Sequence, residues 1–329
     1  MTFIINELNF NVYYFFPESK NRPMETQTYS PPIVFGEVLI DRFPDGSFKL
    51  GGAPFNVAWH LHGFETNPLF ISAVSDDDYG KFILNAMQNW GMDSSGVQIV
   101  TGYPTGRVNV SFTNNEPSFD IAGQQAYDHI NADECIRHLS ARLVSILYFG
   151  SLAQREQNNR NIIKSIVDAY SPLIFNDINL RSPWQNHDII QSLLKISHCV
   201  KMNIDEFISV VEIDPASEPG WLEYSAIFLL KYELRSLIIT AGSRGCYYID
   251  PDYRYYTPAS PCNRFIDSVG AGDAFSAVAI LGLLHGWNPL TTIRNASEFA
   301  SYICGIQGAV SSDRKIYGDF LRKWHHKVL

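Results

Sequence analysis

Short apolar runs alternate along the chain with longer stretches of helical periodicity, beginning near Pro32. The clearest helical patterns cover residues 53–64 and 79–91, and the second ends at a glycine. Strands are predicted at residues 33–41, 68–74, 145–151, 172–179, 197–203 and 236–243. Strands that alternate with helices are typical of βαβ units, so the sequence predicts an α/β fold with a mostly parallel sheet.

One segment departs from this alternation. Residues 106–121 (GRVNVSFTNNEPSFDI) have a period of two around Asn114 and Asn115, and no helix intervenes, which predicts a β-hairpin. A hairpin inserted in an α/β chain often covers a site. We therefore interpret residues 103–125, together with residues 41–50, as a small β lid.

Polar residues follow several predicted strands. Ligands of open α/β sheets bind beyond the carboxyl ends of the strands, so residues at these ends are the first candidates for a binding site. Asp41, Asn179, Asn203 and Gly242 occupy such positions.

Composition excludes several classes of protein. The 329 residues are 46% hydrophobic and 18% charged, as in ordinary globular proteins. The net charge of −9, without a basic stripe, argues against nucleic-acid binding. No stretch approaches the roughly 18 apolar residues of a membrane span. The scattered cysteines predict buried thiols in a reducing, cytoplasmic compartment rather than disulfides or a zinc site: Cys135, Cys199, Cys246, Cys262 and Cys304.

Residues 1–31 precede the periodic part of the chain. They lack the basic region and the small-residue cleavage site of a signal peptide. We interpret them as an N-terminal extension, with disorder and a translation start at Met24 as open alternatives. The folded domain is expected to span residues 32–329.

The stretch DSVGAGDAFSA, residues 267–277, places small residues and an aspartate before an apolar run. Gly270, Ala271 and Gly272 leave the backbone N–H groups of a helix N-terminus uncovered, where they can bind an anion. Asp273 has two interpretations. It is either a helix cap worth about 1 kcal/mol or a general base for a hydroxyl that attacks a bound phosphoryl group.

Two other phosphate-binding motifs do not fit the chain. The P-loop requires a lysine that residues 91–98 (GMDSSGVQ) lack, and the dinucleotide fingerprint requires a third glycine where residues 270–275 end in Phe275. The missing fingerprint counts against an NAD-dependent oxidoreductase, which is the alternative for an α/β chain without further motifs.

A second glycine-containing stretch is GGAPFNVA, residues 51–58. Gly51 and Gly52 permit close backbone approach, and Asn56 offers both a donor and an acceptor, although alone this is a tight turn before a helix. Together with DSVGAGD, it resembles the paired signatures of the ribokinase-like (PfkB-type) carbohydrate kinases, over residues 32–325. The resemblance implies a three-layer αβα sandwich with a mostly parallel central sheet and a small β lid.

The resemblance also implies ATP and Mg²⁺ as cofactors. Asn203 and Glu206 in KMNIDE are similar to the family's N-x-x-E motif, which holds magnesium through water. Without the resemblance, these two residues would be a solvated strand-to-helix cap. Asp267 is a weaker candidate for a monovalent cation, which leaves K⁺ as an open alternative.

A nucleotide-binding turn is implied by TAGSRGC, residues 240–246. Thr240, Gly242 and Gly245 match the family's T-x-G-x-x-G pattern, and Gly270 and Gly272 are expected to complete the nucleotide site. Without the resemblance, Gly242 would belong to a hairpin turn.

Sugar binding is implied for Asp41, Gly51, Gly52 and Asn56. NDINLRSPW, residues 176–184, is similar to a D-x-N-x-R-x-x-W stretch of fructokinases and of 2-keto-3-deoxygluconate kinases. Its Arg181, and Arg107 from the lid, are either ligand contacts or surface arginines. A keto-acid substrate would use an arginine for its carboxylate.

The overall pattern, including AYDHI at residues 126–130, is more similar to fructokinases. We therefore expect an ATP-dependent kinase that phosphorylates a primary hydroxyl of a hexose, with fructose as the first candidate. The alternatives are a 2-keto-3-deoxygluconate or related sugar kinase and a non-catalytic sugar-binding protein on the same fold. The expected partners are a small sugar and ATP, without nucleic acid or membrane, and with a homodimer through the lid.

Overall fold

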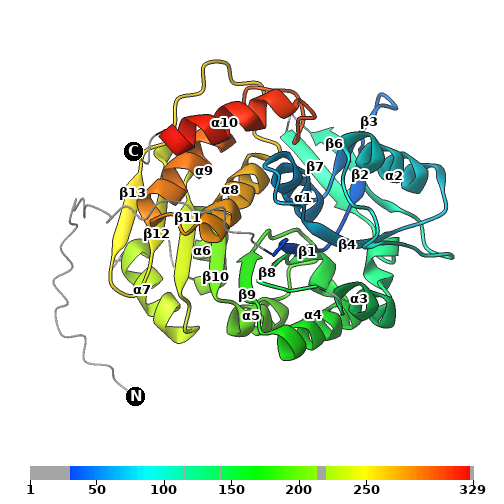
Figure 1. The fold of residues 1–329 in the computed structure, drawn as a ribbon, viewed down its shortest axis with the longest axis horizontal. Helices are drawn as coiled ribbons and strands as arrows, with labels where there is room; N and C mark the ends of the chain where they lie inside the picture. Colours follow the sequence, from blue (N-terminus) through cyan, green and yellow to red (C-terminus); the bar gives the residue numbers. More distant parts are fainter. Residues whose placement is uncertain (1–29, 114–115, 141, 213–219, 327–329) are drawn as a thin grey trace.

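A nine-stranded sheet forms the centre of the molecule (Figure 1), as seen in the computed structural model, which describes residues 30–113, 116–140, 142–212 and 220–326. The strand order is β13-β12-β11-β10-β9-β8-β1-β4-β5, and the strands from β11 to β5 run parallel. Strands β12 and β13 add an antiparallel hairpin at one edge. The predicted α/β fold with a mostly parallel sheet is confirmed. The strands are β1 Ile33–Phe35, β4 Leu69–Val74, β5 Val97–Ile99, β8 Ile146–Gly150, β9 Leu173–Asp177, β10 Cys199–Asn203, β11 Ser236–Thr240, β12 Cys246–Ile249 and β13 Arg254–Thr257.

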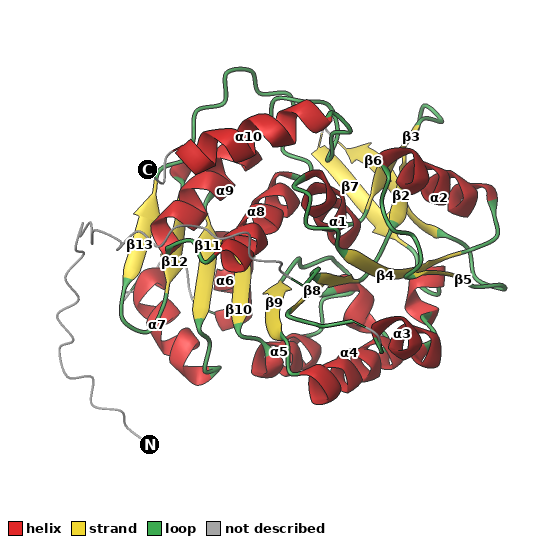
Figure 2. Cartoon of the chain, viewed as in Figure 1, coloured by secondary structure: helices red, strands yellow, loops and turns green. Residues whose placement is uncertain are grey.

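Helices cover both faces of this sheet (Figure 2). One face carries α1 Ala53–Gly63, α8 Ala271–His285, α9 Pro289–Ile303 and α10 Arg314–His326, and α2 Asp78–Trp90 packs beside α1. The other face carries α3 Ala132–Leu139, α4 Gln157–Tyr170, α5 His187–Ile196, α6 Ile204–Val211 and α7 Trp221–Lys231. Short 3₁₀ turns lie at Ala126–His129 (η1), Leu152–Arg155 (η2) and Gly242–Arg244 (η3).

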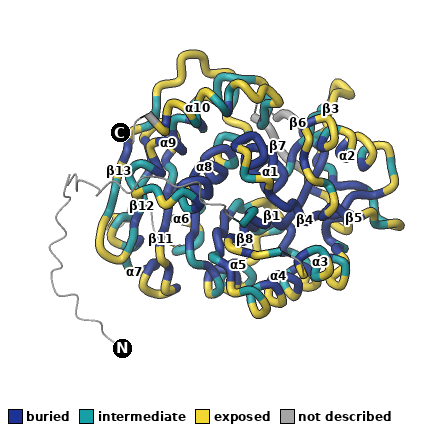
Figure 3. Tube along the Cα trace, viewed as in Figure 1, coloured by how far each residue is buried: buried dark blue, intermediate teal, exposed yellow. Residues whose placement is uncertain are grey.

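The alternation of side chains along each strand explains why both faces need helices. In β1, Val34 packs into the core under α1 and α8, whereas Ile33 and Phe35 pack into the core under α3 and α4. All three are buried, and Figure 3 shows the central strands as mainly buried. A parallel sheet that is buried on both faces reads as the continuous apolar runs seen in the sequence.

A separate four-stranded sheet has the order β3-β2-β6-β7. The predicted hairpin is its β6–β7 pair, although its turn residues Asn114 and Asn115 lie outside the described residues. The segment 41–50 joins it, because β2 pairs with both β3 and β6. The strands are β2 Leu39–Arg42, β3 Phe48–Gly51, β6 Gly106–Thr113 and β7 Glu116–Ile121.

The prediction of one strand over residues 33–41 is wrong. The chain leaves the large sheet after Phe35 and enters the small sheet at Leu39. Gly36, at φ 151°, makes this change of direction, and a Cβ atom there would overlap the Pro54 ring of α1. As a result, Glu37 rather than Asp41 follows the end of β1.

The prediction for the cysteines is only partly right. Cys135, Cys199 and Cys246 are buried free thiols, but Cys262 is exposed and Cys304 is partly exposed. Within the described ranges, no helix is long and apolar enough to cross a membrane. Residues 1–29, most of the predicted extension, lie outside the described residues.

Candidate active site

The first turn of α8 contains the GAGD stretch. Gly270 precedes the helix with φ 76°, and a Cβ atom there would lie 2.5 Å from the backbone of Ala309, so only glycine fits. No side chain caps this helix start. The Ala271 N–H donates to the Ser268 carbonyl oxygen at 3.2 Å. Among the described residues, the Gly272 N–H in the same turn has no side-chain acceptor, and an uncapped helix start of this kind binds anions.

Asp273 and Asn56 join the two glycine-containing motifs. The Asn56 Nδ2 donates a hydrogen bond of 2.8 Å to the Asp273 Oδ2, across 217 positions of sequence. The carboxylate of Asp273 thus faces a side chain of α1 and is not the cap of its own helix. Burial raises the pKa of Asp273 to about 6, against the hydrogen bond from Asn56, and the charge of Asp177 raises it further.

A buried ion pair lies directly under this helix start. The Lys201 Nζ is 2.9 Å from both carboxylate oxygens of Asp177, and the two side chains are only 7% and 3% exposed. The Ser276 hydroxyl of α8 donates to Asp177 at 2.7 Å. A Cβ atom on Gly272 would lie 3.2 Å from the Lys201 Nζ, so the ammonium group lies against the first turn of α8.

Lys201 stays charged in this environment. Burial lowers its pKa, but the neighbouring carboxylates of Asp177 and Glu206 outweigh that effect and the pKa is raised. Sequence reasoning missed Lys201, and it gave no role to Asp177, the first residue of the D-x-N-x-R-x-x-W stretch. The signal was available, because a charged residue within an apolar strand is almost always paired.

Asn203 and Glu206 form a capping box at the start of α6. The Glu206 N–H donates to the Asn203 Oδ1, and the Asn203 N–H donates to the Glu206 Oε2, each at 2.8 Å. The Leu180 N–H donates to the second oxygen of Glu206 at 3.1 Å. Burial raises the pKa of Glu206 to about 7, although the charge of Lys201 opposes it.

These contacts test whether a metal ion fits. The carboxylate of Glu206 keeps lone pairs free toward solvent, but the described residues hold no group of three or more His, Cys, Asp or Glu that could enclose a metal. This donor set suits Mg²⁺, which usually keeps several waters and binds one or two carboxylates together with phosphates. Asp267 accepts a 2.7 Å hydrogen bond from the Val269 N–H in its own loop, and it belongs to no group of three or more such residues within the described part of the chain.

The predicted nucleotide turn follows β11 and lies beside Asn203. Thr240 pairs in register with Asn203, so both residues end neighbouring strands at the same edge of the sheet. Gly242 and Gly245 have φ angles of 56° and 96° and carry the chain through a tight turn into β12. No atom lies within 4 Å of the position that a Cβ atom would take at Gly242, so its backbone is open to a ligand.

Gly51 and Gly52 pack directly on two acidic residues. A Cβ atom on Gly51 would lie 2.8 Å from the Asp41 carboxylate, and one on Gly52 would lie 2.6 Å from the Glu37 carbonyl oxygen. Burial raises the pKa of Asp41 to about 6 and the pKa of Glu37 to about 7, and in both cases the charge of Arg181 opposes the shift. Glu37 is 3% exposed, and sequence reasoning missed it because residues 33–41 were treated as one strand.

The two candidate arginines separate in the structure. Arg181 acts electrostatically on Glu37, Asp41 and Asp273 together. Arg107 pairs in register with Ile40, so its side chain lies on the face of the small sheet opposite to that of Asp41. Its charge helps to lower the pKa of Asp77 at the start of α2. The structure therefore brings Arg181 to the site and does not bring Arg107 to it.

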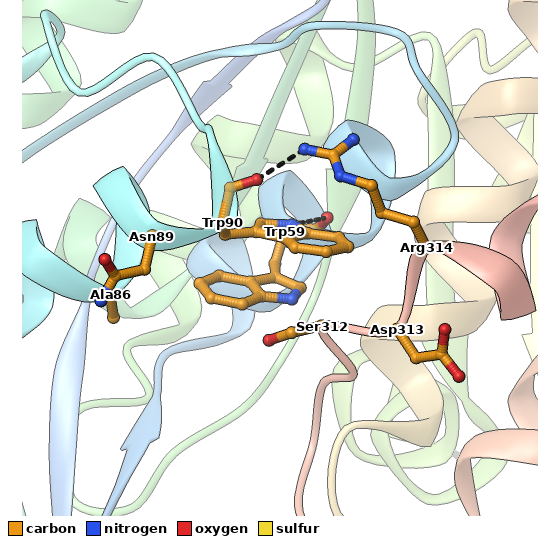
Figure 4. A pocket seen from close by; sticks show the side chains of 7 residues that line it. All are labelled: Trp59, Ala86, Asn89, Trp90, Ser312, Asp313 and Arg314. Carbon is orange, nitrogen blue, oxygen red and sulfur yellow. Dashed lines mark hydrogen bonds between the residues drawn. The ribbon is translucent and has the colours of Figure 1, made fainter.

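A surface hollow of about 550 Å³ lies between α1, the end of α2 and the segment before α10 (Figure 4). The indoles of Trp59 and Trp90 stack with their ring centroids 5.5 Å apart. The Arg314 guanidinium donates to the Trp90 carbonyl oxygen at 2.8 Å. The Trp59 indole N–H donates to the Ser311 carbonyl oxygen. The guanidinium of Arg314 and the indoles of this hollow therefore already have partners within the protein. For this reason we place the candidate active site at Asp273 and not at this hollow.

The architecture and the helix start with its aspartate define a ribokinase-like α/β protein that can hold a phosphorylated ligand beside a hydroxyl. The chain belongs to the pfkB family of carbohydrate kinases, whose model matches residues 23–316. It is therefore a sugar kinase, a phosphotransferase with an alcohol group as acceptor.

Named relatives agree with this assignment. The chain is 27% identical to fructokinase-2 of Oryza sativa subsp. japonica, over 74% of this chain and 76% of the relative. It is 24% identical to 5-dehydro-2-deoxygluconokinase of Clostridium beijerinckii, over 88% of this chain and 96% of the relative. The solved fructokinase of Vibrio cholerae O395, with bound fructose, ADP and calcium, superimposes with a TM-score of 0.73 at 18% identity, over 89% and 99%, which supports the fold alone.

Proposed function

We propose that this kinase uses ATP and Mg²⁺ to phosphorylate a primary hydroxyl of fructose. The observation that carries the proposal is the hydrogen bond between Asn56 and Asp273 at the uncapped start of α8. This hydrogen bond holds the carboxylate of Asp273 in place beside a helix start that can bind an anion. Phosphoryl transfer to an alcohol requires a base positioned in this way beside the phosphate. The fructokinase relatives favour fructose over other hexoses.

In the proposed reaction, Asp273 is the general base. It accepts the proton of the sugar hydroxyl as that oxygen bonds to the γ-phosphorus, and the bond to the β,γ-bridging oxygen breaks to release ADP. Backbone N–H groups at Gly270 and Gly272 bind the charge that develops on the phosphoryl oxygens, and Ala271, whose own N–H donates to the Ser268 carbonyl oxygen, is small enough to leave them uncovered. Lys201, under the same turn, adds a positive charge nearby.

The nucleotide is proposed to lie along the neighbouring strand ends, at Thr240, Gly242 and Gly245, with Gly270 and Gly272 at its phosphates. Mg²⁺ supplies charge neutralisation of those phosphates when bound. Asn203 and Glu206 would hold it through water, and Asp267 remains the candidate for K⁺. These residues follow β10 and β11 or lie near α8, on one side of Asp273.

The sugar is proposed to bind on the other side, at Asp41, Gly51, Gly52 and Asn56, with Arg181 facing it. The small sheet, including residues 103–125, would cover the sugar as a lid. We also propose a homodimer through this lid, and a cytoplasmic protein in keeping with its free cysteines.

Fructose should give the highest kcat/KM in an ADP-release assay against a panel of sugars and sugar acids. Each rate is compared with the ATP hydrolysis measured without sugar, and product NMR locates the phosphate on a primary hydroxyl. A clear preference for a nucleoside or for a sugar acid would contradict the fructose assignment and leave the kinase class intact.

The second candidate substrate is a keto sugar acid. It is favoured by the 5-dehydro-2-deoxygluconokinase relative and by Arg181, whose charge acts on three carboxylates. Among the described contacts, the Arg181 guanidinium donates only to the Leu180 carbonyl oxygen, in the loop after β9. Arg181→Met should separate the two candidates, because a carboxylate substrate would lose about 10–100-fold in kcat/KM with loss of a charge-assisted hydrogen bond.

The activity should fall at acid pH. The base must be deprotonated to accept a proton, and burial raises the pKa of Asp273 to about 6. We expect kcat for fructose to fall as the pH drops below about 6, the value just cited, whereas an aspartate with an ordinary pKa near 3.9 would hold full activity to about pH 5. The fall of kcat/KM should begin near pH 7, because Glu37 and Glu206, with pKa values of about 7, are protonated first. Initial rates between pH 5 and 8, with enzyme stability checked at each pH, test this limb.

A further inference from the structure

A buried polar cluster lies next to the site and is not used by the reaction described above. Its centre is Arg155, whose Nε and Nη2 donate to the two oxygens of Asp128 at 2.9 and 2.6 Å. The two side chains are 4% and 0% exposed. The guanidinium also lies over the rings of Tyr127 and Trp184, at 5.3 and 4.3 Å from their centroids. Arg155 is thus fixed in one orientation on three sides.

Three atoms of this cluster have no hydrogen-bond partner among the described residues: the Arg155 Nη1, the Tyr127 hydroxyl and the Glu37 Oε2. All three side chains are more than nine-tenths buried. Buried polar groups in folded proteins almost always have partners. The same buried region therefore contains one donor (Arg155 Nη1), one acceptor (Glu37 Oε2) and one hydroxyl that can do either (Tyr127), all available to a ligand.

The cluster is continuous with the site around Asp273. Glu37 follows β1, and Arg155 closes the turn after β8, which is the strand beside β1. The charges of Arg155, Arg181 and Asp273 all act on Glu37, and the charge of Glu37 acts on Tyr127. The Tyr127 ring lies against Gly106 of the small sheet, where a Cβ atom would lie 2.9 Å from it.

Apolar side chains close the same region from above. Leu39, Val108 and Ile121 lie on the same face of the small sheet as Asp41. They pack with Leu152 and Trp184. The Trp184 indole N–H donates to the Ile121 carbonyl oxygen at 2.8 Å and fixes the ring over Arg155. An apolar cover over a few convergent polar atoms is the usual construction of a small-molecule site.

We propose that Glu37, Tyr127 and Arg155 form the inner wall of the sugar site and bind hydroxyl groups of the substrate remote from the one that is phosphorylated. The inference rests on the proposed function, in that the sugar lies between this wall and Asp273. Glu37 accepts from a sugar hydroxyl, the Arg155 Nη1 donates to a sugar oxygen, and Tyr127 completes the set. The ligand class is a polyhydroxylated sugar, and an analogue that lacks the matching hydroxyl is rejected because the wall is left unpaired.

Tyr127→Phe tests the wall most cleanly, because it removes a hydroxyl that has no protein partner. If the hydroxyl were only structural, the variant would gain stability or be unchanged, and its kinetics would be normal. We expect an unchanged or higher Tm, a KM for fructose raised about tenfold, and an unchanged KM for ATP. A Tyr127→Phe enzyme with a wild-type KM for fructose would overturn the role of this hydroxyl.

Tyr317→Phe is the matched control. Its buried hydroxyl donates to the Ser311 carbonyl oxygen at 2.9 Å and lies 2.9 Å from the His60 ring, away from the cluster. This variant should lower the Tm without changing the KM for fructose. A raised KM with an unchanged Tm in Tyr127→Phe, and a lowered Tm with an unchanged KM in Tyr317→Phe, would distinguish a role in sugar binding from a role in packing.

Glu37→Gln extends the test to the charged member. It keeps the volume of the side chain. At pH 8, above the pKa of about 7 that burial gives Glu37, the KM for fructose should rise about 10–100-fold, since the substitution weakens a hydrogen bond to a charged acceptor. Glu298→Gln, at a glutamate that binds Trp324 far from the site, is its control and should leave the KM unchanged.

Deoxyfructose analogues, each lacking one hydroxyl, identify the group that the wall binds. The analogue without that hydroxyl should lose affinity for the wild type and lose little more for Tyr127→Phe, whereas the other analogues lose affinity equally for both. If wild-type enzyme rejects fructose, the proposed substrate fails, and the same variants are measured with the best sugar of the panel. Equal KM values for that sugar in all variants would then overturn the wall itself.

Discussion

Replacing Asp273 with asparagine is expected to reduce kcat by about 10²–10⁴-fold, which is roughly 3–5 kcal/mol of barrier. The substitution removes the proton acceptor, but it keeps the shape of the side chain and leaves an oxygen that can accept from Asn56. The KM for ATP and the Tm should change little. Steady-state kinetics with fructose and a thermal melt measure all three.

Asp77→Asn is the matched control for this variant. Asp77 also stands at the start of a helix, where it accepts from the Gly80 N–H at 2.8 Å, but it lies at α2, away from Asp273. It accepts from the backbone N–H and the hydroxyl of Thr105 as well, at 3.0 and 2.6 Å, so the Tm of the control is measured together with its kcat. Asparagine caps a helix about as well as aspartate, so kcat should stay near the wild-type value. If Asp273→Asn keeps more than about a tenth of wild-type kcat, the base lies elsewhere and GAGD is only an anion-binding helix start.

Lys201→Met is expected to lower the free energy of unfolding by about 3–5 kcal/mol. The variant leaves the carboxylate of Asp177 buried without its counter-ion. Among the described side chains, the hydroxyls of Ser276 and Tyr148 remain within hydrogen-bond distance of it. Urea denaturation at neutral pH measures the loss.

A second substitution tests the cause. Asp177→Asn in the Lys201→Met background removes the uncompensated charge, and most of the lost stability should return, because neutral replacement of both partners of a buried pair is often tolerated. Lys81→Met, in an exposed pair with Asp78, should cost less than about 1 kcal/mol. If the double variant is no more stable than Lys201→Met, the loss comes from packing rather than from the unpaired carboxylate.

The periodicity of the chain predicted the fold because a parallel sheet is buried on both faces. The strands at residues 68–74, 145–151 and 197–203 are all observed within two residues of their predicted ends. Period-two alternation likewise identified the hairpin. The strand at residues 33–41 was wrong because both of its halves are apolar and only Gly36 marks the change of sheet.

The site was predicted where backbone geometry demands particular residues. Gly270 and the Gly51-Gly52 pair stand where a Cβ atom would collide, and these constraints are local enough to leave a motif. Glu37 and Lys201 leave none, since their importance comes from burial beside residues of other strands. Asp177 belongs to a motif, but nothing in its local sequence marks the pairing with Lys201. Arg107 was included for its place in the lid strand, but the pleat of β6 directs it to the other face.

The most direct measurement of the central claim is the distance between Asp273 and the nearer primary hydroxyl of bound fructose. A crystal structure with fructose and a non-hydrolysable ATP analogue supplies it. The account predicts one carboxylate oxygen within about 2.6–3.2 Å of that hydroxyl, or one water away, and the terminal phosphate at the start of α8. Fructose bound with its nearer primary hydroxyl directed to another base, without direct or water-mediated contact with Asp273, would contradict the account.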